Sequence, residues 1–98
     1  MTIEKNLNGS ELNITITGRL DTTTAPQLEA ELKQSLPGIE KLVMDFAALE
    51  YLSSAGLRVL LQAQKTMNKQ GEMIITNVNE TINDIFEVTG FVDILTIA

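Results

Sequence analysis

Two adjacent hydroxyl side chains, Ser53 and Ser54, directly precede Ala55-Gly56 and a series of apolar residues at helical spacing. A hydroxyl at a helix start lies beside unpaired backbone N–H groups and the positive end of the helix dipole, which stabilise a phosphate carried there. Arg58 follows one turn later, and because helical side chains lean toward the N-terminus, its guanidinium could reach a group on Ser54. Residue types alone favour a simpler role, in which one serine caps the helix and Arg58 is a solvated cation.

Two acidic residues, Asp21 and Asp45, stand where predicted strands end. Parallel strands joined by helices place their strand-to-helix loops at one edge of the sheet, where open α/β folds bind their ligands. We therefore expect Asp21, Thr22 and Asp45 to lie near Ser54. By itself Asp21 is more typical of a turn residue, whereas Asp45 is equally compatible with a loop-capping and a functional carboxylate.

The amino-acid inventory excludes most hydrolytic chemistry. The chain of 98 residues contains no cysteine and no histidine, so thiol nucleophiles, disulfides, imidazole bases and the two best zinc ligands are all missing. A hydrolase that used Ser54 as its nucleophile would need another base, and the sequence places none beside it. We therefore expect no catalytic residue, no metal site and no cofactor.

Charge and hydropathy exclude two classes of partner, nucleic acids and membranes. Thirteen acidic residues against seven basic ones give a net charge of -6 without a basic run, which argues against nucleic-acid binding. The polar N-terminus and the short apolar runs argue against a secretion signal and against membrane insertion. The length suits one small domain, which we place at residues 1–98, and we expect a cytoplasmic protein.

The N-terminal segment has the pattern of a β-hairpin. Leu12, Ile14 and Ile16 alternate with polar residues, which is the period of a strand with one buried face. Asn8-Gly9 supplies the turn before this strand, and Gly18 is expected to end it.

Three segments have helical spacing. The first begins at Thr24 with the form of a capping box and stops at Pro37-Gly38. The second is indicated by Leu57, Leu60, Leu61 and Met67 and is expected to end at Gly71, and the third is capped by Asn79 or Thr81 and ends near Gly90.

Three apolar segments are predicted strands. The first, 42–46, is almost continuously apolar, as expected for a central strand covered on both faces, and 73–75 and 94–97 follow it. Strands and helices alternate along the chain, which predicts a single α/β domain. We expect an N-terminal hairpin leading into a mixed, largely parallel sheet of about five strands with three crossover helices.

Three motifs resemble the signature of STAS domains, the anti-sigma-factor antagonist family. The stretch from Asp45 to Leu57, DFAALEYLSSAGL, is similar to the family's D-L-S-x-V-x-[FY]-[IL]-D-S-[ST]-G-L without a gap. Gly18-Arg19-Leu20-Asp21 resembles the G-x-[LI]-D motif, and Val88-Thr89-Gly90-Phe91 resembles L-T-G-L. The resemblance extends over essentially the whole chain.

The resemblance implies a function in signalling. In this family a serine at the position of Ser54 is phosphorylated by an anti-sigma factor, a serine kinase with a histidine-kinase-like ATPase fold, and a PP2C-type phosphatase removes the phosphate. The protein is then a non-enzymatic partner switch in transcription regulation, which binds the kinase when unphosphorylated and is released by phosphorylation. The residues expected at the partner surface are Asp21, Thr22, Asp45, Ser53, Ala55, Gly56 and Arg58.

Two positions depart from the family pattern. Ser53 replaces the usual acidic residue, and Ala55 replaces the usual serine or threonine. Ser53 is therefore a second candidate phosphate acceptor, although the register of Gly56-Leu57 assigns Ser54. The same departures support an alternative function, a non-phosphorylated STAS scaffold subunit of a larger assembly such as a stressosome-like or lipid-transport complex.

Overall fold

The N-terminal hairpin supplies the first two strands, β1 (Thr2–Asn8) and β2 (Glu11–Leu20), in a computed structural model that describes residues 1–98. The two strands pair antiparallel along their common length. Gly9 in the connecting turn has φ 64°, a left-handed conformation that glycine adopts without strain. The predicted hairpin is confirmed.

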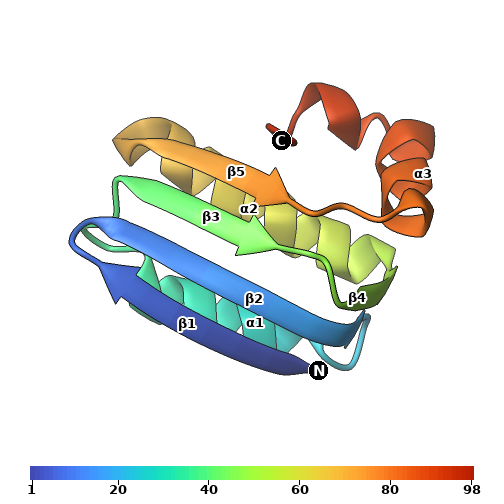
Figure 1. Ribbon diagram of the computed structural model, residues 1–98, viewed down its shortest axis with the longest axis horizontal. Coiled ribbons are helices and arrows are strands. Elements are labelled where there is room, and N and C mark those ends of the chain that lie inside the picture. Colours follow the sequence, from blue (N-terminus) through green and yellow to red (C-terminus); the bar gives the residue numbers. More distant parts are fainter.

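Three further strands complete a mixed sheet (Figure 1). β3 (Lys41–Asp45) pairs parallel with the first half of β2, and β5 (Glu72–Thr76) pairs parallel with β3. β4 (Leu49–Leu52) pairs parallel with the end of β2 and lies off the main path of the sheet. The predicted α/β class, with a largely parallel five-stranded sheet after an N-terminal hairpin, is confirmed.

β2 changes neighbours at Gly18 instead of ending there. The pairing register shifts between Gly18 and Arg19, and the strand continues beside β4 to Leu20. Gly18 has φ 99° and donates its backbone N–H to the carbonyl oxygen of Ala48 at 3.0 Å. Glycine tolerates this conformation, so β2 can change neighbours here, and the extra residue at the irregularity is Glu50 of β4, which lies between the partners Leu49 and Tyr51. The expectation that Gly18 ends the strand is wrong.

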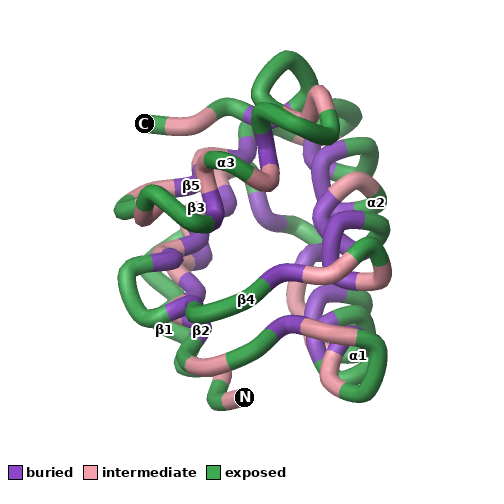
Figure 2. The backbone as a smooth tube through the Cα atoms, turned by 90° about the vertical axis from the view of Figure 1, so that its right-hand side faces the viewer, coloured by how far each residue is buried: buried purple, intermediate pink, exposed green.

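The helices cover one face and one end of the sheet. α1 (Ala25–Ser35) and α2 (Ser54–Gln70) lie side by side against one face, and α3 (Glu80–Thr89) lies at the end where β3 and β5 finish (Figures 1 and 2). Along β3 the even-numbered residues are buried under these helices, whereas Val43 is only half-buried. The expectation that this strand is covered on both faces is wrong, because no helix lies on the other face. None of the helices has the length and apolar character that a membrane-crossing segment requires.

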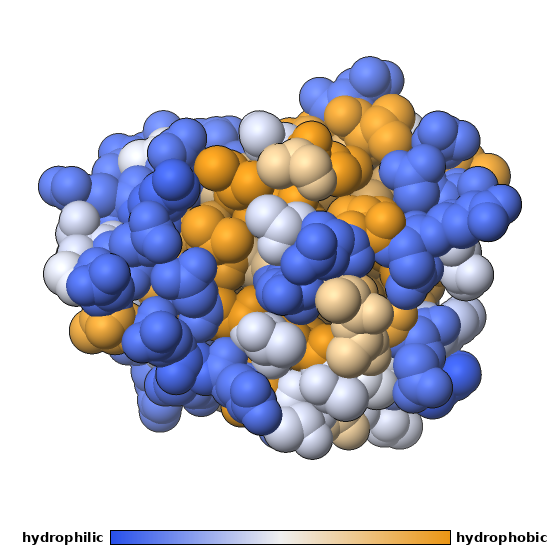
Figure 3. Space-filling model, in the orientation of Figure 1, coloured by the Kyte–Doolittle hydropathy of each residue, from blue (hydrophilic) through white to orange (hydrophobic).

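The uncovered face of the sheet is shown in Figure 3. Polar side chains lie over the starts of the strands, where Lys41 Nζ is 3.9 Å from a carboxylate oxygen of Glu11 and 3.9 Å from one of Glu72. Val43 and Ile74 are neighbours in the middle of this face and are half-buried. The uncovered face therefore carries charged side chains at one end and is apolar toward its centre.

A core of 24 buried apolar residues fills the space between the sheet and the helices. Leu28 and Leu32 of α1, which the helical spacing predicts, and Leu60 of α2 belong to it. The rings of Phe46 and Phe86 lie with centroids 6.4 Å apart and join the end of β3 to α3. Full burial of such a side chain stabilises a fold by about 1.5–3 kcal/mol. The core thereby fixes the helices from which the site is built.

The predicted helix ends agree in position, but one cap differs. α2 ends at Gly71, and α3 follows Asn79, whose side chain accepts the Ile82 N–H at 2.9 Å. Thr24 precedes α1 without capping it, because its hydroxyl oxygen accepts the Asp21 N–H at 2.8 Å and its proton is donated to the carbonyl oxygen of Arg19 at 2.8 Å. The predicted capping box is therefore wrong, although the helix begins where it was expected.

The C-terminal segment 94–97 does not form the predicted strand. Phe91–Asp93 form a short 3-10 helix, after which Ile97 alone bridges to Ile75 of β5. The fifth strand is β4 instead, whose sequence LEYL is apolar at both ends and polar in the middle and so lacks the alternation of a strand. Both errors reflect pairing partners that local sequence does not specify.

Candidate functional site

The end of β2 and the start of α2 are joined directly. The backbone N–H of Ser53 donates to the carbonyl oxygen of Leu20 at 2.9 Å. Gly56 in the first turn of α2 permits this approach, because a Cβ atom there would lie 2.7 Å from the side chains of Leu20 and Leu52 and 3.0 Å from the Leu20 carbonyl oxygen. The two sequence motifs that contain Asp21 and Ser54 are therefore neighbours in space.

The two serines at the start of α2 have different environments. Ser53 is the N-cap, half-buried, and its Oγ accepts the backbone N–H of Gly56 at 3.4 Å. Ser54 is the first helical residue, is exposed, and its hydroxyl makes no hydrogen bond within the protein. The capping role that residue types favoured thus falls to Ser53. Ser54 keeps a free hydroxyl at the surface.

The first turn of α2 favours a negative charge. It contains no acidic residue, and the backbone N–H groups of Ser54 and Ala55 have no acceptor in the preceding turn. Such a helix start stabilises a nearby anion by about 0.3–1 kcal/mol when it is exposed to solvent. A phosphate on Ser54 would therefore be tolerated by this domain without rearrangement of the helix.

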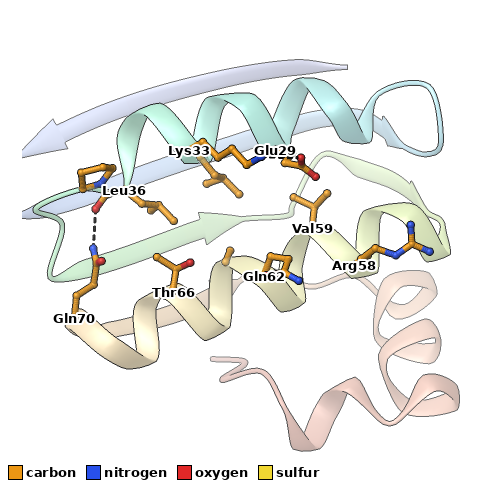
Figure 4. Close-up of a pocket in the computed structure, with 11 residues that line it drawn as sticks. Glu29, Lys33, Leu36, Arg58, Val59, Gln62, Thr66 and Gln70 are labelled. Atoms are coloured by element: carbon orange, nitrogen blue, oxygen red, sulfur yellow. Dashed lines mark hydrogen bonds and ion pairs between the residues drawn. The ribbon is translucent and has the colours of Figure 1, made fainter.

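Arg58 is exposed on α2 and forms no ion pair. Figure 4 shows its side chain at the end of α2 that carries Ser54. No hydrogen bond joins Arg58 to the Ser54 hydroxyl, which is neutral and gives the guanidinium no charge to bind. Contact between Arg58 and a modified Ser54 stays a prediction.

Asp21 organises the loop between β2 and α1. Its Oδ1 accepts the Thr23 hydroxyl at 2.8 Å, the Thr23 N–H at 3.0 Å and the Thr24 N–H at 3.2 Å. The hydrogen bond from the Thr23 hydroxyl is the main cause that lowers the pKa of Asp21 below the ordinary aspartate value, and the backbone N–H groups add to it. Asp21 is thus an ionised carboxylate held in a fixed orientation. Thr22, between these donors, is exposed.

Sequence analysis missed a cation–π pair beside Asp21, formed by Arg19 and Tyr51. The Arg19 guanidinium lies 4.4 Å from the centre of the Tyr51 ring, and its Nε is 3.7 Å from an Asp21 carboxylate oxygen. These two residues are opposite each other because β4 pairs with the end of β2. Both side chains lie within the matched motifs, but their contact depends on the unpredicted strand β4. Arg19 and Tyr51 therefore join the candidate site.

Asp45 occupies a different place from Asp21. Its Oδ1 accepts the backbone N–H of Ala47 at 2.9 Å, which stabilises the turn after β3. The whole of β4 separates this turn from Ser53, and no hydrogen bond or ion pair connects Asp45 to the Ser54 loop. The loop-capping role considered for Asp45 is thus observed, and its contact with a partner stays a prediction. No group of acidic side chains is arranged to hold a metal ion.

Comparison with known proteins identifies the family, because the STAS domain matches residues 2–98. The chain belongs to the STAS domain family. Among its curated relatives, BtrV of Bordetella bronchiseptica, a candidate anti-sigma factor antagonist, is 37% identical over 83 residues, which cover 83% of this chain and 72% of BtrV. The anti-sigma-B factor antagonist of Listeria monocytogenes is 30% identical over 96 residues, which cover 95% of this chain and 83% of that protein.

Solved structures share the STAS fold. The anti-sigma factor antagonist SpoIIAA in its unphosphorylated form matches with a TM-score of 0.85 and 18% identity, over 99% of this chain and 88% of that chain. The phosphorylated form of SpoIIAA from Bacillus matches with a TM-score of 0.77 and 18% identity, over 99% of this chain and 91% of that chain. The predicted fold family is confirmed.

Proposed function

We propose that this STAS protein is an anti-sigma factor antagonist that binds an anti-sigma serine kinase while Ser54 is unmodified and is released when the kinase phosphorylates Ser54. The observation that carries the proposal is the division of roles at the start of α2, where Ser53 caps the helix and Ser54 is exposed and unbonded. The names of the two relatives support the antagonist role.

The switch is a change of charge. A phosphate adds about -1.5 to -2 charges at neutral pH. The loop of the ionised Asp21 meets the start of α2, and Arg19 already offsets the Asp21 charge, so the phosphate adds its full charge of about -1.5 to -2 to the surface that the partner meets. A surface that accommodates a neutral hydroxyl would have to bury a hydrated dianion. Each 1.4 kcal/mol of added cost weakens the affinity about tenfold.

The domain itself changes little on modification. The helix start and Arg58 offset part of the added charge, and the hydrogen bonds of the Asp21 loop do not involve the Ser54 hydroxyl. The partner therefore distinguishes the two forms by the phosphate on Ser54, on a surface whose conformation is otherwise unchanged. Nucleotide, metal and base for the phosphoryl transfer come from the kinase, and a PP2C-type phosphatase restores the hydroxyl.

The modification is tested by incubating the protein with candidate anti-sigma kinases and ATP and locating the phosphate by mass spectrometry. We expect modification at Ser54 in the wild type and in the matched variant Ser53→Ala, and none in Ser54→Ala. Phosphate on Ser53 in the wild type would contradict the assignment of roles to the two serines.

The binding step is tested by calorimetry with the kinase. Ser54→Ala should bind as the wild type does, whereas Ser54→Asp and the phosphorylated protein should bind more weakly. Equal affinity of the unmodified and phosphorylated proteins would contradict the charge mechanism. A protein that is always recovered unmodified within a stable complex would instead favour the scaffold function, which the replacements at Ser53 and Ala55 support.

A further inference from the structure

α2 has a charge opposite to that of the rest of the chain. It contains three of the seven basic residues and none of the thirteen acidic residues. Arg58, Lys65 and Lys69 lie seven and four residues apart, which places them on the same side of the helix, and all three are exposed. We call these three residues the basic stripe.

The basic stripe is the unpaired part of the protein's positive charge. None of its three residues forms an ion pair, whereas each of the other four basic residues lies beside a carboxylate: Lys5, Arg19, Lys33 and Lys41. The helix dipole accounts for a basic residue near the end of α2, such as Lys69. It does not account for Arg58, which stands in the second turn near the positive end of the dipole.

A groove of about 700 Å³ runs beside the basic stripe, between α1 and α2 (Figure 4). Its floor is formed by buried apolar side chains of both helices, Leu32, Leu36, Val59 and Ala63. The wall on α1 is electrically neutral, because Glu29 and Lys33 pair with each other at 3.3 Å. The groove thus has an apolar floor, and its one unpaired charged lining residue is Arg58, whereas Lys65 and Lys69 lie outside the groove on the neighbouring exposed side of α2.

The two ends of the groove differ. At one end the Gln70 side chain donates to the carbonyl oxygens of Leu36 at 2.7 Å and Ile39 at 2.6 Å, which ties α2 to the end of α1. At the other end lies Arg58, next to the turn that carries Ser54 (Figure 4). An occupant of the groove would therefore run along α2 toward the candidate modification site.

We propose that the groove and the basic stripe together form a docking surface for an acidic, amphipathic helix of the partner kinase. Apolar side chains of that helix would enter the groove, and its carboxylates would face Arg58, Lys65 and Lys69. The inference rests on the proposed function and adds the chemistry of the partner to it. α2 then has two roles: its groove-facing side and basic stripe bind the kinase, and its first turn exposes Ser54 for phosphorylation.

Charge selects this occupant over two others. A nucleic acid would meet the net charge of -6 around the stripe, and three cations neutralise few phosphates. A second copy of the chain carries the same net charge and is repelled at a distance. A protein segment with a few carboxylates on one side can pair with the three basic residues. Unlike a nucleic acid, it places no long run of negative charge against the rest of this acidic surface.

The test compares two variants that make the same change in net charge. Lys65→Gln/Lys69→Gln removes two positive charges from the stripe, and Asn6→Asp/Gln34→Glu adds two negative charges at exposed positions elsewhere. Association with the kinase that modifies Ser54 is measured at low and moderate salt. We expect the stripe variant to associate about tenfold more slowly at low salt and the difference to shrink as salt screens it, with little effect of the control. Equal rates for both variants would overturn the proposal.

A peptide titration followed by NMR needs no kinase. The probe is a synthetic helical peptide with leucines on one face and glutamates beside them, and the control peptide has the same composition in scrambled order. We expect the amphipathic peptide to shift the amide signals of α2 and of the groove, and the scrambled peptide to bind several-fold more weakly. Equal binding of the two peptides, shifts centred elsewhere, or concentration-dependent shifts of the protein alone on this face would overturn it.

The two proposals fail in distinguishable ways. If Ser54→Ala binds the kinase and the stripe variant does so equally well, the docking surface is wrong and the switch stands. If no kinase modifies Ser54 but the amphipathic peptide binds the groove selectively, the switch is wrong and the docking surface stands.

Discussion

The loop that holds Asp21 and the turn that starts α2 meet at the end of β2, but they use their polar groups in opposite ways. Asp21 accepts three hydrogen bonds from Thr23 and Thr24 at 2.8–3.2 Å, and the Thr24 hydroxyl bonds back to β2. Of the two serine side chains at the start of α2, that of Ser53 accepts one hydrogen bond at 3.4 Å and that of Ser54 makes none. A group that is already bonded is costly to replace, whereas a free one can change its chemistry without disturbing the fold. Asp21 and Ser53 therefore hold the structure of the site, whereas Ser54 is the residue that can be modified.

The largest expected effect is on the contact between the two regions. Gly56→Ala places a Cβ atom 2.7 Å from the side chains of Leu20 and Leu52. The clash should outweigh the better helix propensity of alanine and lower the free energy of unfolding by about 1–2 kcal/mol. Urea unfolding measures it, with the exposed Gln62→Ala as the control. An unchanged midpoint for Gly56→Ala would show that α2 does not need this close approach.

Ser53→Ala tests the cap. Loss of the N-cap side chain should lower the free energy of unfolding by about 0.5–1 kcal/mol, at the lower part of the usual range because the bond is long. Ser53→Asp keeps an acceptor and should retain the stability of the wild type. If Ser54→Ala costs more than Ser53→Ala, the division of roles between the serines is wrong.

The pH dependence of the Asp21 loop follows from its lowered pKa. The stabilisation by the ionised carboxylate is present above the ordinary aspartate pKa and is lost as the pH falls through the lowered pKa of the folded protein. Asp21→Asn should therefore flatten the acid side of the stability profile measured by thermal unfolding. Thr23→Val, which removes the hydroxyl that donates to Asp21, should flatten it in part. A profile unchanged in both variants would contradict the hydrogen-bonding account.

The smallest expected effect is at Ser54. Ser54→Ala should change the free energy of unfolding by less than about 0.5 kcal/mol, since the hydroxyl is exposed and unbonded. Phosphate on Ser54 should raise stability by up to about 1 kcal/mol through the helix start and Arg58. Arg58→Gln should reduce this gain without affecting the unmodified protein. Thermal unfolding of the four forms measures it, and an equal gain in both backgrounds would mean that Arg58 does not reach the phosphate.

Local sequence predicts the features that depend on the spacing of apolar residues and on the residues that favour turns and helix caps. The hairpin, the three helices and the position of the serines at a helix start all follow from residues that act on their immediate neighbours, such as Gly9 and Asn79. β4 and the contact between Arg19 and Tyr51 do not, because both depend on the irregular pairing of β4 with the end of β2. At Thr24 the sequence predicts a feature, a helix cap, that the structure does not form. Its sequence context is that of a cap, but the loop before it uses the hydroxyl.

The redirection of β2 at Gly18 divides the strand into two halves with separate duties. Its first half belongs to the hairpin and to β3, and its second half, through β4 and the Leu20 carbonyl, sets the spacing between Asp21 and the serines. An insertion or deletion before Gly18 would move the buried residues Leu12, Ile14 and Ile16 off the core face and would destabilise the whole fold. One after Gly18 would turn Arg19 and Leu20 each onto the face opposite to its present one, and would break the contacts of Arg19 with Tyr51 and of the Leu20 carbonyl with Ser53. The first half of β2 therefore maintains the core, whereas the second half maintains the geometry of the candidate site.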